Sequence, residues 1–304
     1  MSACEPTRFR HFIRQHFKSS HPVRTEFPTT ASPNRFTRRG SLLPLLSLTG
    51  VIMLAGGCGA SVATGDAGKA DPGHATVTIR VSAAASLTEL LTTLEPVYEA
   101  DHPETDLVFM FGASGALAEQ IAQGAPADLF LSAAAQPMDK LDKAGLLAGG
   151  TRIDCLANRL VLVVPATRAS LEDFSDAASD AVQRLAIGDP ATVPAGAYAM
   201  EAFDHLGIID EVKRKAVYAK DVRAVLAWVA AGEADAGVVY ASDVLHQKKV
   251  VRAATADDSL HAPILYPGAV MSASAHAEEA EGFLRYLADP GQDAVIESFG
   301  FTRP

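Results

Sequence analysis

Cysteine and basic charge are both scarce in this sequence. It holds 3 cysteines in 304 residues, and two of them, Cys4 and Cys58, lie in or directly after an N-terminal leader, so no internal disulfide is expected in the rest of the chain. The net charge is −10, and 8 of the 26 basic but only 2 of the 36 acidic residues precede Cys58. The part after Cys58 is therefore strongly acidic, which argues against a nucleic-acid partner, because such proteins need a basic face.

Metal-binding motifs and repeats are lacking as well. Four of the 9 histidines are widely spaced along the second half of the chain: His205, His246, His261 and His276. Since no HxH or HExxH spacing occurs, no resident metal or cofactor is expected. No fixed period is visible, which excludes a solenoid. The remaining cysteine, Cys155, stands in an apolar stretch and is expected to be a small buried side chain.

The only long apolar run lies in the leader, residues 1–57. Arg35, Arg38 and Arg39 precede an apolar segment at 41–54, which ends in Ala55-Gly56-Gly57-Cys58. A basic region, a short apolar region and a small-residue cleavage site are typical of a signal peptide, and the run is too short for a comfortable membrane span. The sequence therefore predicts export from the cytoplasm.

The end of the leader resembles the lipobox of bacterial lipoproteins. This likeness implies that Cys58 is lipidated and anchors the mature protein to a membrane, although Ala55 stands where lipoboxes usually carry leucine. Residues 37–42 resemble a twin-arginine signal that lacks its usual phenylalanine, and an ordinary secretory signal with a chance arginine pair remains the alternative. Residues 58–75 are rich in Gly, Ala, Ser and Asp, which predicts a flexible tether.

From Thr76 onward, strand patterns alternate with helix patterns. Residues 76–82 alternate with period two, and Leu87, Leu90, Leu91 and Leu94 then follow at helical spacing. Further apolar strands are predicted at 106–111, 128–132, 159–165, 185–188 and 236–240, with amphipathic helices between them. Alternation of this kind predicts α/β architecture, with parallel sheets covered by helices.

Polar or helix-opening residues follow several of these strands. In open α/β sheets, ligands bind beyond the carboxyl ends of the strands, where helix N-termini offer free N–H groups. Ser86 and Ser114 follow the first two strands, residues 193–196 and 221–223 open later helices, and Tyr240 ends a strand. Taken singly, each serine could be a helix N-cap and Tyr240 a packed aromatic. Together they indicate an anion site.

Several motifs in order carry a resemblance to a known family. Val81–Thr88 resembles the opening of the periplasmic molybdate-binding proteins. The likeness continues through residues 111–118, 124–133, 157–161, 186–196, 232–240, 266–267 and 300–301. It implies a two-lobed periplasmic-binding-protein fold of type II, each lobe being a mainly parallel sheet flanked by helices. Lobe I would comprise 76–158 and 265–304, and lobe II 159–264.

The same resemblance implies the ligand and its contacts. The ligand would be molybdate or tungstate, held by Ser86 and Ser114 from lobe I. From lobe II it would be held by the backbone amides of Ala195 and Val222 and by the hydroxyl of Tyr240. The implied role is that of a monomeric, non-enzymatic receptor outside the cytoplasm, which passes the ion to an ABC transporter permease and its ATPase.

The implied contacts agree with the chemistry of such an ion. A fully deprotonated tetrahedral dianion offers only acceptors, so a selective site should present only donors. A phosphate site would want a carboxylate for the remaining proton, and none of the five positions supplies one. Neutral donors can hold the charge with the help of helix dipoles and a dry cleft.

Three alternatives stay open on the sequence. A receptor for sulfate or another oxyanion would share the fold. A cytoplasmic ligand-sensing regulator is disfavoured by the leader and by the lack of a helix-turn-helix segment. A serine hydrolase is suggested by Gly112–Ala116, which resembles a nucleophile elbow but ends in Ala116 instead of glycine.

Overall fold

The computed structural model of the protein describes residues 76–168 and 171–304. The predicted signal peptide, the predicted lipidation site Cys58 and the predicted tether at 58–75 lie outside these residues. Among the described helices, none is both long enough and apolar enough to cross a bilayer.

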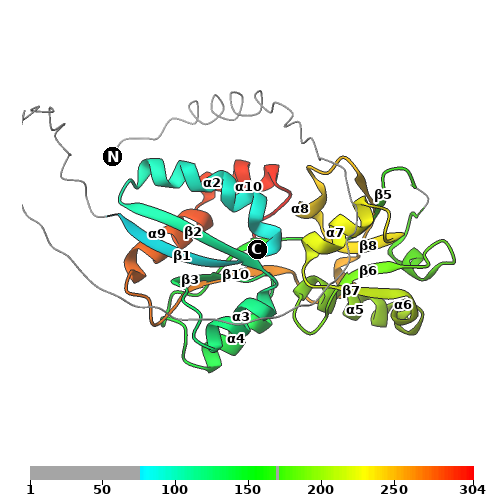
Figure 1. Ribbon diagram of the computed structural model, residues 1–304, viewed down its shortest axis with the longest axis horizontal. Helices are drawn as coiled ribbons and strands as arrows, with labels where there is room; N and C mark the ends of the chain where they lie inside the picture. The colour runs from blue at the N-terminus through cyan, green and yellow to red at the C-terminus, as the bar shows by residue number, and fades with distance from the viewer. Residues whose placement is uncertain (1–75, 169–170) are drawn as a thin grey trace, which may run out of the picture. The chain divides into compact units, whose positions relative to one another are not determined.

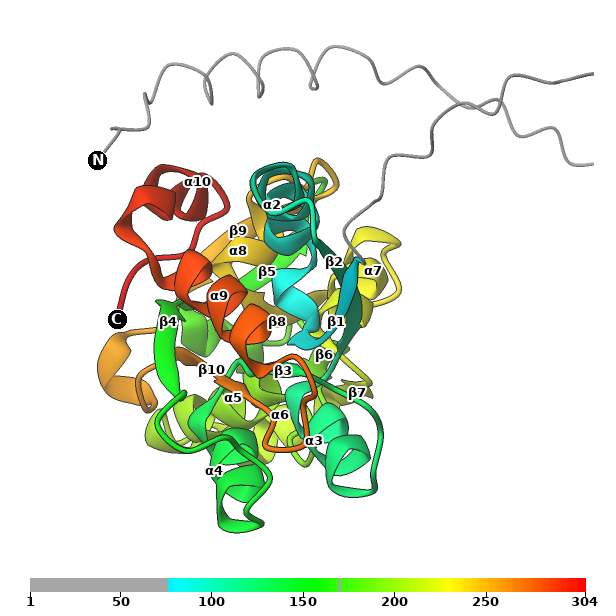
Figure 2. The same cartoon turned by 90° about the vertical axis from the view of Figure 1, so that its left-hand side faces the viewer.

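The first sheet has five strands in the order β2-β1-β3-β10-β4 (Figure 1). They are β1 (Val77–Ala84), β2 (Thr105–Gly112), β3 (Leu129–Leu131), β4 (Ile153–Ala157) and β10 (Leu265–Val270). β1 runs parallel to β2 and β3, whereas β10 runs antiparallel to β3 and β4. The helices around this sheet are η1 (Ala85–Leu87), α2 (Thr88–Asp101), α3 (Ser114–Ala122), α4 (Ala135–Lys143), α9 (Ala277–Ala288), η4 (Pro290–Gln292) and α10 (Asp293–Ser298). Figure 2 shows α2 and α9 on one face, and α3 and α4 on the other.

The second sheet has the order β7-β6-β8-β5-β9. Its strands are β5 (Leu160–Pro165), β6 (Leu185–Gly188), β7 (Ala216–Ala219), β8 (Ala236–Tyr240) and β9 (Val250–Thr255). β6 is parallel to β7 and β8, and β5 is antiparallel to β8 and β9. The surrounding helices are η2 (Phe174–Ala178), α5 (Pro194–His205), α6 (Ile209–Lys215), α7 (Val222–Ala230), α8 (Ala241–Val244) and η3 (Asp258–Leu260).

The predicted two-lobed α/β fold is confirmed. Within it each sheet is mixed, because β10 returns antiparallel into the first sheet and β5 runs antiparallel between two strands of the second. The chain passes between the sheets twice, once at Asn158 between β4 and β5 and once through residues 256–264 between β9 and β10. These two connections bring distant parts of the sequence to the boundary between the lobes.

Each lobe has its own apolar core. In the first, Leu90 and Leu94 of α2 and Phe283 of α9 are fully buried against the sheet, and in the second the whole of Leu160–Val164 is buried. Cys155 in β4 is buried as expected, and desolvation raises the pKa of its thiol to about 12, which leaves it an inert packing residue.

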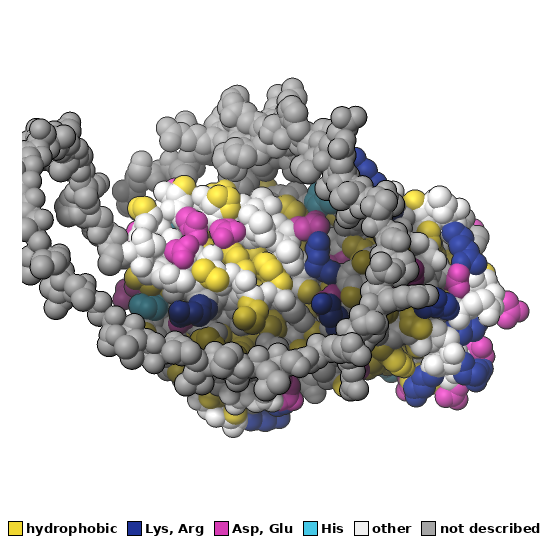
Figure 3. Space-filling model, in the orientation of Figure 1, with side chains coloured by type: hydrophobic (Ala, Val, Ile, Leu, Met, Phe, Trp, Pro, Cys, Tyr) yellow, Lys and Arg dark blue, Asp and Glu magenta, His cyan; other side chains and the backbone are white. Residues whose placement is uncertain are grey.

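The edge strand β2 is an exception to this burial. Val108 and Met110 on β2 are 48% and 51% exposed. Hydrophobic side chains accordingly gather on the face where β2 lies (Figure 3).

Candidate functional site

The five residues predicted from the sequence line one small cavity. Ser86, Ser114, Ala195, Val222 and Tyr240 all border a cavity of about 10 Å³. A volume of this size is about what one water molecule needs, so little open space remains between the lining residues in this structure. The rest of the lining is mostly small: Ala84, Ala85, Gly112, Ala113, Ala133, Val193, Pro194 and Asp221. The open space is thus small, and mostly small side chains surround it.

Neither serine acts as a helix cap. Ser86 lies inside the short helix η1, and Ser114 is the first residue of α3, whose N-cap position is Ala113. Within the described chain, η1, α2 and α3 have no side-chain cap hydrogen bond at all. The capping interpretation is therefore wrong for both serines, although both are buried.

The hydrogen bonds of Ser114 leave its hydroxyl hydrogen available. Its Oγ accepts a hydrogen bond from the backbone N–H of Ala133, with an N–O distance of 2.9 Å. A hydroxyl that accepts in this way still has one O–H to donate. Because Ser114 lines the cavity, we expect that O–H to serve an acceptor placed there.

Three helices begin at the cavity. The first N–H groups of an α-helix have no partner within the helix, and α3 and α5 have no side-chain cap to replace one among the described residues. At α7, Asp221 caps the N–H of Ala224 at 2.8 Å, which leaves the N–H of Val222 without that partner. The N-termini of α3, α5 and α7 thus bring backbone donors and positive dipole ends to one place.

Tyr240 contributes a buried hydroxyl that has no hydrogen-bond partner among the residues the structure describes. The residue is 1% exposed, and its Oη makes no hydrogen bond within the described part of the chain. Burial, followed by the proximity of Tyr266, raises the pKa of Tyr240 well above its usual value of 10, so the group stays protonated and can donate. Leaving such a group unpaired costs about 1–3 kcal/mol, which an acceptor in the cavity would offset.

The described part of the lining contains no positively charged side chain. Among the described residues that border the cavity, Asp221 alone is charged, and its carboxylate is engaged in the α7 cap. Arg223, the residue after Val222, lies 3.6 Å from the carboxylate of Glu89 on α2. The site therefore offers neutral O–H and N–H donors, a chemistry suited to an ion that has only acceptors.

The two lobes touch beside the cavity. The N–H of Gly115 at the start of α3 donates to the carbonyl of Thr192 at 2.9 Å. A Cβ on Gly115 would lie 2.6 Å from that carbonyl oxygen, closer than atoms can approach. Glycine at position 115 therefore permits the approach of the Thr192 backbone.

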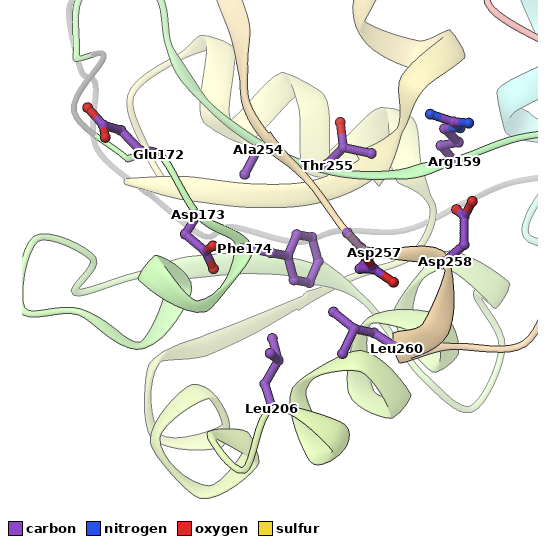
Figure 4. Close-up of a pocket in the computed structure, with 11 residues that line it drawn as sticks. Arg159, Glu172, Asp173, Phe174, Leu206, Ala254, Thr255, Asp257, Asp258 and Leu260 are labelled. Atoms are coloured by element: carbon purple, nitrogen blue, oxygen red, sulfur yellow. The ribbon is translucent and has the colours of Figure 1, made fainter.

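A larger pocket in the second lobe lacks these features. It has a volume of about 530 Å³, and none of the five predicted residues lines it (Figure 4). Asp173 and Asp257 on its wall cap η2 and η3, and hydrogen bonds from Ser175 and Ser259 lower the pKa of the two carboxyls. Ionised carboxylates repel an anion. Within the described ranges, no group of three or more His, Cys, Asp or Glu side chains could hold a metal ion.

Two polar residues behind the cavity were not predicted. Tyr266 Oη lies 2.9 Å from Ser86 Oγ, and Asn158 Nδ2 donates to Tyr266 Oη at 3.2 Å. Tyr266 belongs to a segment that the family resemblance includes, but neither its type nor its spacing indicates a partner 180 residues earlier in the chain.

Comparisons with known proteins agree with this geometry. The family model described as "Bacterial extracellular solute-binding protein" matches residues 79–302. The Bacillus subtilis protein YvgL, provisionally named an ABC transporter substrate-binding lipoprotein, is 40% identical over 85% of this chain and 96% of its own length. The molybdate-binding protein ModA of Haemophilus influenzae is 35% identical over 75% of this chain and 91% of its own length.

A solved structure is similar as well. The substrate-binding domain of a provisionally assigned molybdenum ABC transporter from Clostridium difficile matches with a TM-score of 0.61 and 39% identity. The match covers 75% of this chain and 100% of that domain. Sequence family and fold thus lead to the same assignment. The chain belongs to the family of bacterial extracellular solute-binding proteins.

Proposed function

We propose that this protein captures molybdate or tungstate in the cavity between its lobes and delivers it to an ABC import permease and its ATPase. The observation that carries the proposal is the composition of the cavity: three hydroxyl groups and three helix N-termini, with no cationic side chain among the described lining residues. A tetrahedral ion with no proton is the ligand that such a donor set suits best.

The relatives support this ligand. ModA of Haemophilus influenzae is named as molybdate-binding, and the Clostridium difficile domain is named for a molybdenum transporter. Ser86, Ser114 and Tyr240 would donate from their side chains, and Ala195 and Val222 from their backbone amides. No additional cofactor is needed, because the oxyanion is the cargo.

Location and assembly are part of the same proposal. A signal peptide that ends at Cys58 would place the mature chain outside the cytoplasm, with lipid on that cysteine as its membrane anchor. The name of the Bacillus subtilis relative, a lipoprotein, supports this arrangement. A monomer on a tether could reach a membrane-embedded permease.

A hydrolase is disfavoured by the surroundings of Ser114. A serine nucleophile needs a base within hydrogen-bond reach, and no histidine occurs among the described residues of the lining. Ser114 Oγ is bound instead to the N–H of Ala133. Ester turnover that disappears in Ser114→Ala would overturn this reasoning, whereas we expect that variant only to weaken anion binding.

Calorimetric titration with molybdate, tungstate, sulfate and phosphate tests the ligand. Molybdate and tungstate should bind far more tightly than sulfate, and phosphate most weakly because it keeps a proton. Ser114→Ala should lose affinity, and Ser298→Ala, whose hydroxyl donates to Val295 in α10, is a control with unchanged binding. Sulfate binding as tight as molybdate binding would favour a general oxyanion receptor instead.

A further inference from the structure

Tyr266 and Asn158 lie directly behind the cavity without lining it. Tyr266 is 2% exposed and stands in β10, and Asn158 is 9% exposed at the first crossing between the lobes. The Tyr266 ring packs edge-on against Tyr240 and Phe301, at centroid distances of 5.8 and 5.4 Å. Both polar groups are therefore held rigidly next to a hydroxyl of the proposed site.

The orientation of the Asn158 amide is fixed by the backbone. Its Oδ1 accepts from the N–H of Arg159 at 2.8 Å, and a backbone N–H can only donate, so this atom must be the oxygen. The Nδ2 group then carries two hydrogens. They point to Ser242 Oγ at 2.9 Å and to Tyr266 Oη at 3.2 Å. Asn158 is consequently a donor to Tyr266.

That donation sets the direction of the next hydrogen bond. Within residues 76–168 and 171–304, Tyr266 Oη has one other partner, Ser86 Oγ at 2.9 Å. If Ser86 donated to Tyr266, the buried hydrogen of Tyr266 would lack an acceptor among the described residues, which is unfavourable for a buried hydroxyl. Tyr266 therefore donates to Ser86, and the Ser86 hydrogen is left to turn toward the cavity.

We propose that Asn158 and Tyr266 are positioning residues that orient the Ser86 hydroxyl as a donor, and so make the cavity selective for oxyanions without a proton. This inference rests on the proposed function. Hydrogen bonds that run in one direction along a chain strengthen each other, so the donation from Ser86 gains from both residues behind it. The Ser114 hydroxyl is oriented in a similar way, because its oxygen accepts from the N–H of Ala133 and its hydrogen stays available to donate.

The first test compares two ions in Tyr266→Phe. The molybdate Kd should rise about 3- to 10-fold, the value of one ordinary hydrogen bond. The Kd of hydrogen phosphate should rise less than that of molybdate, because a Ser86 hydroxyl that is free to rotate can accept a hydrogen bond from the P–OH group. We call the hydrogen bonds from Asn158 to Tyr266 and from Tyr266 to Ser86 the relay. Tyr198→Phe is the matched control, because that buried hydroxyl lies 3.5 Å from the Pro263 carbonyl and is not part of the relay. Equal losses for both ions, or no loss, would overturn the inference.

The second test reverses the relay. In Asn158→Asp the new carboxylate only accepts, so Tyr266 would donate to it and Ser86 would turn to Tyr266, away from the ion. Binding should weaken by at least about 10-fold, the loss of a hydrogen bond to a charged ligand. In the double variant with Tyr266→Phe there is no hydroxyl to redirect, so the two factors should not multiply. Simple multiplication would refute the relay.

The two proposals can fail separately. If the wild-type chain binds no molybdate but does bind another oxyanion, the proposed function fails, and the same four proteins are titrated with that ion. If the wild type binds molybdate and the effects of Tyr266→Phe and Asn158→Asp simply multiply in the double variant, the relay fails alone. Thermal unfolding of each variant confirms that it is folded, and Tyr266→Phe remains decisive if Asn158→Asp does not fold.

Discussion

Replacing Tyr240 by phenylalanine separates the binding role of its hydroxyl from its packing role. The ring is 1% exposed and packs edge-on against Tyr266, so phenylalanine keeps these contacts and removes one oxygen. That oxygen has no hydrogen-bond partner in the described chain. The folded protein without ligand therefore loses no internal hydrogen bond.

The size of the effect follows from the chemistry of the lost bond. A hydrogen bond from a neutral donor to a charged group contributes about 1.5–3 kcal/mol, which corresponds to a rise of about 10- to 100-fold in the molybdate Kd. Stability without ligand should stay equal or rise by up to about 3 kcal/mol, because an unpaired buried hydroxyl is removed. Affinity and stability should thus change in opposite directions.

Isothermal calorimetry measures the affinity, and urea unfolding without ligand measures the stability. Tyr198→Phe again serves as the control, because Tyr198 is a buried tyrosine on α5 that does not line the cavity. A molybdate Kd within twofold of wild type would refute the assignment of Tyr240 as a donor. A loss of affinity matched by a loss of stability would show that the hydroxyl matters for folding instead.

Three further predictions concern closure, charge and motion. Gly115→Ala should weaken molybdate binding, because its Cβ would lie 2.6 Å from the Thr192 carbonyl oxygen and push the lobes apart. Gly149→Ala is the control, because open space surrounds that position. Equal Kd values for the two variants would show that the contact between Gly115 and Thr192 is not needed for binding. Burial raises the pKa of Asp243 from 3.8 to about 7, so the folded state holds its proton more tightly and stability should fall as pH rises from about 4 to 7. The free energy of unfolding of the wild type should fall by roughly 4 kcal/mol across this range, and that of Asp243→Asn should not. Unfolding curves measured from about pH 4 to 7 test this, and a difference between the two proteins that does not change with pH would contradict it. Small-angle scattering should show compaction when molybdate is added, and no change would count against lobe closure.

The fold was predictable because its main signals are local. Strands such as β5 and β8 are continuous apolar runs, and helices such as α2 and α7 show clear amphipathic spacing. Strands β4, β9 and β10 give a weaker signal, because Asp154, Arg252 and Pro267 interrupt their apolar runs. The antiparallel pairing of β10 depends on where the chain returns to the sheet, which its own residues do not encode.

The five residues that line the candidate site could be named from the sequence, but their hydrogen bonds could not. Ser86 and Ser114 follow strands, and the family resemblance selected them from among many serines. That neither one caps a helix became clear only from the structure. The direction of the Ser86 hydroxyl depends on Asn158, which lies at the first crossing between the lobes, and on Tyr266, which follows the second.

The absence of lysine and arginine from the described lining has a consequence for the conditions in which the protein can work. An ion held by a lysine or arginine at an exposed surface is released as salt concentration rises, because dissolved ions compete for the same charges. Uncharged donors in an enclosed space are little affected by such competition. Retention of the ion should therefore change little between fresh and saline surroundings, and separation of the lobes, which exposes the ion to water, would be the step that sets it free.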